Sequence, residues 1–335
     1  MKKRILFLFT GYIFLAMIFI PATLLAAPYY EGKVMVLLVG HGPGGGFDRI
    51  TRILARYLPK YIPGKPVIIV KNMPGAGTLI AANHLYNVAK PNGLTIGLID
   101  RGVPFAQLLK AKGIEFDLRK FIPLGAPFPD SMVLAVRPDL PYKTYDDLKN
   151  SNRPIYFGAS GPATTDYQYP AMLKEFLKLN FKIVIYDSSS QTRLAIQRKE
   201  VDGKAGSFAT MRRDVEEGSL RAVIRCRVSV PGIEDLQVDE ELTTSEVGKK
   251  IMAMRTAPDR AGRCYLAPPG TPKKIVNILR NALAKAYEDP KLRADFKKQS
   301  MSVQFVPGDE YKKMIDFVLN QPEDIIKEFS KYIKF

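Results

Sequence analysis

The sequence predicts an α/β protein made of two units of similar plan. Apolar runs typical of buried strands alternate with helical patterns between residues 34 and 99, and again between residues 155 and 228. The length of 335 residues is consistent with two domains. Loops rich in glycine or hydroxyl groups follow several of the strands. Because ligands of such sheets bind beyond the carboxyl ends of the strands, we expect a binding site where these loops meet.

The first unit opens with a strand over 34–39, a glycine loop and a helix over 47–57. The helix is indicated by apolar residues at helical spacing. Glycine lets the backbone approach a ligand closely, and a helix start presents unpaired N–H groups and a positive dipole end. The loop from Gly42 to Asp48 is therefore predicted to bind an anionic group.

A second loop of the same kind follows the next strand, 67–70, and precedes a helix over 79–88. It contains Gly75 and Gly77. The strand over 94–99 then completes a strand–helix alternation that favours a largely parallel sheet. Both glycine loops would lie at the same edge of that sheet, which strengthens the hypothesis of one shared site.

The second unit repeats this plan after a strand over 133–136 and a short helix over 145–148. Its predicted elements are strands at 155–158, 182–186 and 220–228, and helices at 167–179, 190–199 and 210–217. Residues 264–270 should cross back to the first unit, and helices are expected over 273–287, 290–298, 309–319 and 323–331. The loop at 160–165 offers hydroxyls and backbone donors to a ligand. An ordinary helix cap at Thr165 or Asp166 would use the same N–H groups, so both interpretations stay open.

Other motif interpretations are weaker. Residues 40–45 match the dinucleotide pattern G-x-G-x-x-G, but the next strand ends in Lys71-Asn72 and lacks the acidic partner of that fingerprint. The glycines could also serve only to turn the chain. The acidic stretch 200–203 suggests a turn with solvated acids rather than a catalytic carboxylate pair, because no partner base is evident.

The amino terminus has the pattern of a secretory signal peptide over residues 1–26, with a basic start, an apolar run and small residues at its end. An uncleaved anchor helix is the alternative. Without this segment the net charge falls from +17 to +14. No run of like charges or RNA-binding motif is present, so the positive charge favours small anionic solutes over nucleic acid.

Export would permit a disulfide between Cys226 and Cys264, but their spacing does not decide whether they pair. His41 and His84 are too few and too far apart to suggest a zinc site. We expect no metal and no cofactor.

Several stretches in this order resemble the periplasmic receptors of tripartite tricarboxylate transporters, the family of the Bordetella uptake (Bug) proteins. They are Pro43 to Asp48 with Arg52, Asn72 to Gly77, Pro91 to Gly93, Ser160-Gly161, Arg198 to Gly203 and Ala267 to Pro272. The resemblance implies a two-lobed type II periplasmic binding protein, with two Rossmann-like lobes joined by two crossing strands. Lobe 1 would comprise 27–130 and 264–335, and lobe 2 would comprise 131–263.

The resemblance also implies a carboxylate held between the lobes, mainly by backbone N–H groups. The positions it assigns to ligand binding are Pro43, Gly44, Gly45, Gly46, Asp48, Gly75, Ala76, Gly77, Thr78, Ser160, Gly161, Thr164, Tyr167, Tyr186, Asp187 and Ser188. The chain departs from the family pattern at Ala163, Tyr167 and Asp187. Tyr167 could cover an aromatic or long apolar acid, and Asp187 disfavours a polyanion such as citrate.

The main hypothesis is therefore an exported, monomeric solute-binding protein that is not an enzyme. It would capture a small organic mono- or dicarboxylate and deliver it to membrane transporter subunits. An exported hydrolase using His41 as its base is one alternative. A sensory binding protein that presents its closed form to a receptor is another, which the sequence does not separate from transport.

Overall fold

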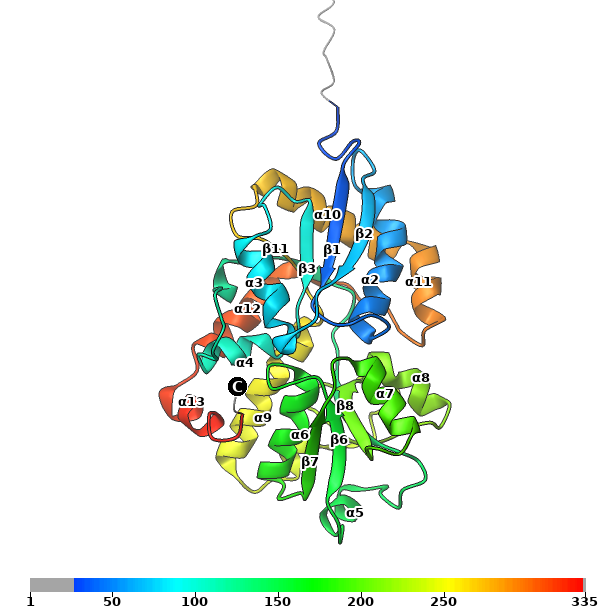
Figure 1. The fold of residues 1–335 in the computed structure, drawn as a ribbon, viewed down its shortest axis with the longest axis vertical. Coiled ribbons are helices and arrows are strands. Elements are labelled where there is room, and N and C mark those ends of the chain that lie inside the picture. Colours follow the sequence, from blue (N-terminus) through cyan, green and yellow to red (C-terminus); the bar gives the residue numbers. More distant parts are fainter. Residues whose placement is uncertain (1–26, 334–335) are drawn as a thin grey trace, which may run out of the picture.

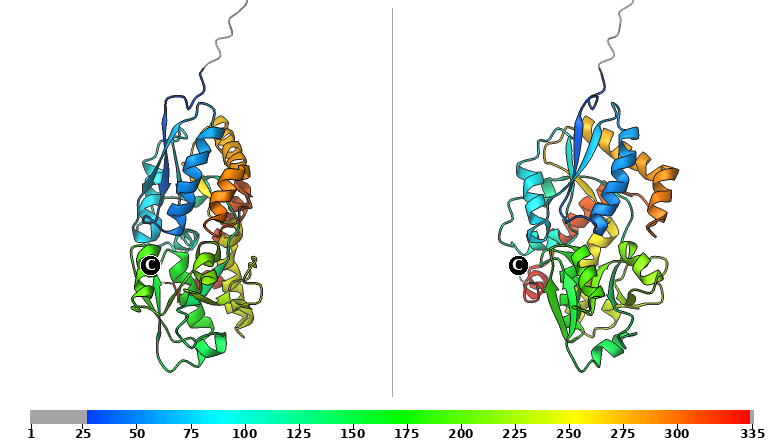
Figure 2. Two further views of the ribbon diagram at one scale, coloured as in Figure 1. Left: turned by 90° about the vertical axis from the view of Figure 1, so that its right-hand side faces the viewer. Right: turned by 45° about the vertical axis from the view of Figure 1, so that its right-hand side comes forward.

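The computed structural model describes residues 27–333 and shows two α/β lobes stacked along the long axis of the molecule (Figures 1 and 2). The predicted signal peptide lies outside the described residues. Within residues 27–333, no helix combines the length and apolar character needed to cross a membrane.

The sheet of lobe 1 has six strands in the order β12-β4-β11-β3-β1-β2. Their bounds are β1 (Val34–Val39), β2 (Val67–Asn72), β3 (Thr95–Leu98), β4 (Ile122–Ala126), β11 (Tyr265–Ala267) and β12 (Val306–Pro307). The central β1 is parallel to both β2 and β3, as expected. The expectation of a largely parallel sheet was wrong beyond β3, because β11 runs antiparallel to β3 and β4.

The sheet of lobe 2 follows the order β10-β9-β5-β8-β6-β7. Its strands are β5 (Met132–Val136), β6 (Ile155–Ala159), β7 (Phe181–Ile185), β8 (Gly203–Ser207), β9 (Arg221–Arg225) and β10 (Gln237–Val238). Strand β6 is parallel to β7 and β8, whereas β5 is antiparallel to β8 and β9. Each sheet is mixed because the strand that arrives from the other lobe enters against the direction of its neighbours.

Helices flank both sheets (Figure 1). In lobe 1 they are α2 (Gly46–Tyr57), α3 (Leu79–Asn87), α4 (Val103–Leu108), α10 (Lys273–Glu288), α11 (Pro290–Lys297) and α12 (Gly308–Leu319). In lobe 2 they are α5 (Tyr145–Lys149), α6 (Thr165–Phe176), α7 (Ser189–Gln197) and α8 (Phe208–Glu216), with α9 (Glu246–Ala261) leading back toward lobe 1 and α13 (Glu323–Phe329) near the carboxyl end. Helix α6 begins and ends earlier than predicted.

Two short segments cross between the lobes. The chain leaves the first sheet after Ala126 and enters the second at Met132, and it returns between Ala261 and Tyr265. The crossings lie side by side, because the Asp130 amide donates to the Asp259 carbonyl at 2.8 Å.

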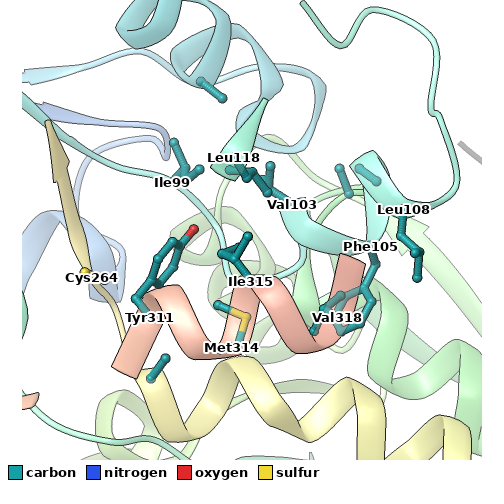
Figure 3. Packing of buried hydrophobic residues seen from close by; sticks show 14 of the residues in the cluster. Ile99, Val103, Phe105, Leu108, Leu118, Cys264, Tyr311, Met314, Ile315 and Val318 are labelled. Atoms are coloured by element: carbon teal, nitrogen blue, oxygen red, sulfur yellow. The ribbon is translucent and has the colours of Figure 1, made fainter. Parts of the chain in front are cut away.

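A single apolar cluster spans both lobes next to the crossings. Figure 3 shows its centre, where α12 packs against α4 and residues of lobe 1. The same cluster includes Ala171 and Met172 of α6 and Ile251 and Met254 of α9. Beyond α13, Tyr332 packs edge-on against Phe176 of α6, with ring centres 4.9 Å apart. The carboxyl-terminal segment therefore reaches lobe 2.

Both cysteines are buried and free, so the disulfide left open by the sequence is not formed. Burial raises the pKa of each thiol to about 12. Each behaves as a small core side chain, because a buried thiol that stays protonated is a poor nucleophile.

Candidate functional site

Three neighbouring cavities lie along the cleft between the lobes. The central cavity, about 50 Å³, is lined by both ends of the first glycine loop, Ser160, Lys204 and Arg263. A cavity of about 460 Å³, here called the loop-side cavity, shares His41 and Ser160 with it. A third, of about 370 Å³, here called the α7-side cavity, shares Gly45, Gly46, Ser189 and Lys204. The three cavities therefore share lining residues along the cleft, and the central cavity is the smallest of the three.

Asp48 organises the first glycine loop. Its carboxylate accepts hydrogen bonds from the Gly44 amide, Arg52 Nε and Asn72 Nδ2, each at 2.9 Å. Burial alone would raise the pKa of Asp48, but these hydrogen bonds outweigh it and lower the pKa. The Asp48 side chain therefore holds the loop. The first amides of α2 have no intrahelical acceptor and remain available to an anion.

The second glycine loop, 75–78, has four consecutive residues with positive φ, and it lines the loop-side cavity. The loop is anchored to the segment after β3, because Thr78 Oγ1 accepts a hydrogen bond from the Asp100 amide at 3.0 Å. Gly77 lies against lobe 2, and a Cβ there would come within 2.7 Å of the Ala163 Cβ. Only glycine fits both its conformation and this approach.

The lobe 2 loop 160–165 differs from the sequence-based picture. The Asp100 carboxylate of lobe 1 accepts from the Thr165 amide at 2.9 Å, which already places an anion at the start of α6. The hydroxyls of Ser160 and Thr164 both donate to the Asp166 carboxylate. The prediction of a helix cap at Thr165 or Asp166 was therefore wrong, because Asp100 of the other lobe accepts from the first amide of α6, while the Ser160 and Thr164 hydroxyls are engaged by Asp166.

The structure gathers most of the predicted positions in the cleft. The loop-side cavity is lined by Gly75, Ala76, Gly77, Thr78, Ser160, Gly161, Thr164, Tyr186 and Asp187, and the α7-side cavity by Gly44, Gly45 and Gly46. Four positions line none of the three cavities: Pro43, Asp48, Tyr167 and Ser188.

Each of these four has another role. Pro43 accepts a hydrogen bond from Ser190 Oγ of lobe 2 at 3.3 Å, and Ser188 caps α7 through the Gln191 amide. Tyr167 packs against the apolar cluster that spans the lobes, so its position does not support a role in covering a ligand.

Three cationic side chains that line the central cavity, Arg101, Lys204 and Arg263, were not among the positions predicted from the sequence. Lys204 lies in β8 and Arg263 in the second crossing segment, and both are buried. Lys204 was detectable in principle, as a lone lysine within a run of small residues. Nothing in its local sequence marks Arg263, because its position depends on the path of the crossing segment.

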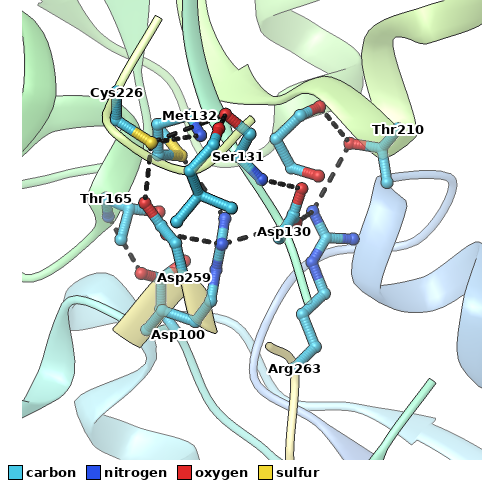
Figure 4. Close-up of polar contacts among 12 residues, drawn as sticks. Asp100, Asp130, Ser131, Met132, Thr165, Thr210, Cys226, Asp259 and Arg263 are labelled. Atoms are coloured by element: carbon cyan, nitrogen blue, oxygen red, sulfur yellow. Dashed lines mark hydrogen bonds and ion pairs between the residues drawn. The ribbon is translucent and has the colours of Figure 1, made fainter. Parts of the chain in front are cut away.

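A buried charge network joins the two crossing segments to lobe 1 (Figure 4). Arg101 Nη1 lies 2.6 Å from Asp259 Oδ1 and 3.4 Å from Asp130 Oδ2. Arg255 Nη2 lies 3.0 Å from Asp259 Oδ2, and Arg263 Nη2 lies 3.6 Å from Asp130 Oδ2. Three arginines therefore share two carboxylates in this network, and the Asp100 carboxylate also acts on Arg101.

His41 is not arranged as the base of a hydrolase. Its Nε2 lies 3.0 Å from Asp100 Oδ2, and its ring stacks on Phe47 with centres 4.3 Å apart. Within residues 27–333, no hydroxyl or thiol is hydrogen-bonded to His41. The arrangement thus lacks the nucleophile–base contact that this alternative requires.

Comparisons with known proteins agree with this geometry. A UPF0065 protein of Bordetella pertussis is 28% identical over 270 residues, which is 79% of each chain. The structure of the periplasmic binding protein BugD superposes with a TM-score of 0.72 and 22% identity, covering 90% of this chain and 98% of that one. MatC from Rhodopseudomonas palustris, solved with bound malate, gives a TM-score of 0.69 and 19% identity, covering 90% and 99%. These two structures show that the fold is that of two-lobed periplasmic binding proteins.

The family model described as the tripartite tricarboxylate transporter family receptor matches residues 50–330, most of the chain. The chain therefore belongs to the tripartite tricarboxylate transporter receptor family.

Proposed function

We propose that this periplasmic solute-binding protein is exported through its amino-terminal segment, captures a small organic carboxylate between its lobes and delivers it to tripartite transporter subunits in the membrane. The observation that carries the proposal is the junction of the first glycine loop with α2. Unpaired amides at the start of a twelve-residue helix face a cleft whose opposite wall belongs to lobe 2. A ligand there contacts both lobes, and its differential affinity for the closed state drives closure.

Relatives support the class of ligand. MatC was solved with malate, a dicarboxylate, and its fold matches over 90% of this chain. The net positive charge of the chain also favours the approach of anions. Binding of this kind requires no chemical step.

The test is a thermal-shift screen of protein comprising residues 27–335 against aliphatic diacids, aromatic acids, hydroxy acids and citrate. A ligand at one hundred times its Kd stabilises the folded state by about 2.7 kcal/mol, which gives a clear shift. The absence of a shift with every acid, in folded protein freed of bound ligand, would refute carboxylate binding.

Substitution of Gly45 then tests the place of binding. Gly45 has φ −72° and ψ 173°, and a Cβ there meets nothing nearer than 3.8 Å, so the position accepts a side chain. Gly45→Asp puts a carboxylate on the α2 amides and is expected to abolish binding, whereas Gly45→Ala retains it. Calorimetry that finds unchanged affinity in Gly45→Asp would exclude the α2 site.

A further inference from the structure

The charged groups that line the central cavity fall into two classes. Asp100 accepts hydrogen bonds from His41, Gly102 and Thr165, and Asp166 accepts from Ser160 and Thr164. Arg101 is paired with Asp259 and Asp130. The two other cations are less well paired: Arg263 has one ion pair, with Asp130 at 3.6 Å, which it shares with Arg101, and the Lys204 ammonium donates to the Ser189 hydroxyl. The uncommitted charge in the cavity is therefore positive.

Arg263 is nearly fully buried and only partly satisfied. Its Nη2 is 3.6 Å from Asp130 Oδ2 and donates to Thr210 Oγ1 at 3.4 Å, both long contacts. Its Nε and Nη1 are buried and have no hydrogen-bond partner. The guanidinium lies over the Phe47 ring, 4.3 Å from its centre, which fixes its plane against the first turn of α2. Unpaired buried donors of this kind are costly unless a ligand uses them.

Lys204 lies at the wall shared by the central and α7-side cavities. It is 7% exposed, and its ammonium donates to Ser189 Oγ. Among residues 27–333, no carboxylate forms an ion pair with it. Burial lowers the pKa of Lys204, with Asp166 and Asp214 partly opposing that effect. A buried ammonium with one neutral acceptor has the capacity to bind an anion.

We infer that Lys204 and Arg263 together bind the second carboxylate of a short dicarboxylate, so that the cleft selects dianions over monoanions. The inference rests on the proposed function. The first carboxylate uses backbone amides of the glycine loops, which carry no full charge, and the second uses the two side-chain cations. The small central cavity favours a short linker between the two groups. Asp187, which disfavours a polyanion, lines the loop-side cavity and not the central one.

The experiment compares succinate with its monoamide, succinamate, which has nearly the same shape and one negative charge fewer. Isothermal titration calorimetry on the wild type should give an affinity for succinate at least about tenfold higher than for succinamate. Lys204→Met keeps the length of the side chain and removes its charge. It should lower succinate affinity by about 10- to 100-fold and leave succinamate affinity within about twofold, which abolishes the selectivity.

Arg198→Met is the matched control. Arg198 follows α7 in the same lobe and is 70% exposed, so its replacement removes an equal charge without touching the cleft. Its affinities should stay at wild-type values. The melting temperature without ligand checks that each variant is folded.

The outcomes separate the inference from the proposed function. Equal wild-type affinity for succinate and succinamate, or equal losses for both in Lys204→Met, would overturn the inference while carboxylate binding stands. Failure of every mono- and dicarboxylate to bind would overturn the proposed function and the inference with it.

Discussion

Asp239 is a buried carboxyl group with few hydrogen-bond partners. Only one of its oxygens has a partner, the Glu240 amide at 2.8 Å, and the other is buried without one. Burial raises the pKa of Asp239 to about 7, although Arg255 of α9 opposes this and Glu240 adds to it. The Tyr169 hydroxyl of α6 also lies nearby, so Asp239 is surrounded by a neutral hydroxyl, the Arg255 cation and the Glu240 carboxylate.

This shift predicts a pH dependence of stability. The ordinary pKa of the group is 3.8, so between about pH 4 and pH 7 the folded state holds a proton that the unfolded state has lost. The contribution of Asp239 to the free energy of unfolding therefore decreases as pH rises through this window. Asp239→Asn should remove the decrease, so the variant gains stability relative to the wild type, by up to a few kcal/mol near pH 7.5.

Urea unfolding of both proteins at about pH 4.5 and about pH 7.5 measures this difference. A stability difference that stays constant between the two pH values would contradict the raised pKa of Asp239.

At the scale of elements, sequence patterns predicted those strands and helices whose own residues determine them. Strand β1 is a continuous apolar run, and α2 has apolar residues at helical spacing. Sequence patterns did not indicate β4, β8 and α9. Strand β4 contains Pro123 and Gly125, and β8 reads Gly-Lys-Ala-Gly-Ser, so both acquire strand conformation from pairing with neighbours. Helix α9 contains Pro258 near its end and little apolar periodicity.

The candidate site likewise has some features that depend on local sequence and others that depend on contacts between distant residues. Glycine loops and the helix start are local features, and the sequence displays them. The Asp100 carboxylate at the start of α6 and the Arg263 guanidinium beside α2 join residues of different lobes, so no local pattern reveals them. The resemblance to the receptor family named loop residues that line the cleft. The positions of the charged side chains inside the cleft became visible only in the three-dimensional structure.

The crossing segments give the next prediction. Asp259 accepts from both Arg101 and Arg255, and all three side chains are buried. Asp259→Asn keeps the shape, leaves the buried Arg255 with a neutral partner and leaves Arg101 with Asp130 alone, at 3.4 Å. Breaking a buried ion pair from one side costs about 3–5 kcal/mol, so the free energy of unfolding should fall by an amount in this range.

Glu217→Gln is a suitable comparison for Asp259→Asn, because it removes the acid of an ion pair with Arg213 in which both side chains are about half exposed. Solvent screens such a pair, so its loss should be far smaller. Chemical denaturation of the two variants measures both effects. Similar losses would mean that the crossing network does not stabilise the fold.

At the scale of the whole molecule, the lobes are closed on one another. Arg49 Nη2 of α2 donates to the Thr210 carbonyl of α8 at 2.9 Å, and Gln168 Nε2 of α6 donates to the Gly102 carbonyl at 3.2 Å. Asp100 bonds to the first turn of α6 from the opposite lobe. These contacts must break for a ligand to enter the narrow central cavity. We therefore expect binding to involve opening and closing about the crossing segments.

Gly46 permits this closure, because a Cβ at that position would lie 2.6 Å from Thr210 Cγ2 and 2.8 Å from Arg263 Nη1. Gly46→Ala should leave lobe 1 folded but oppose the approach of α8. If the clash costs about 1–3 kcal/mol in the closed state alone, affinity for the carboxylate with the largest thermal shift falls by about 5- to 150-fold. Small-angle X-ray scattering at a fixed subsaturating ligand concentration should then show a larger radius of gyration for Gly46→Ala than for the wild type.

Gly45→Ala provides the control for Gly46→Ala, since the added methyl group stands one residue earlier and meets only ordinary contacts at 3.8 Å. It adds the same atoms to the same loop without touching Thr210. Equal affinities for the two alanine variants would show that closure does not bring α8 against α2 in the bound state. A loss confined to Gly46→Ala would instead tie binding to the approach of the two lobes, because only that methyl group comes within 3 Å of Thr210 in lobe 2, whereas the Gly45→Ala methyl group keeps 3.8 Å from Ser189.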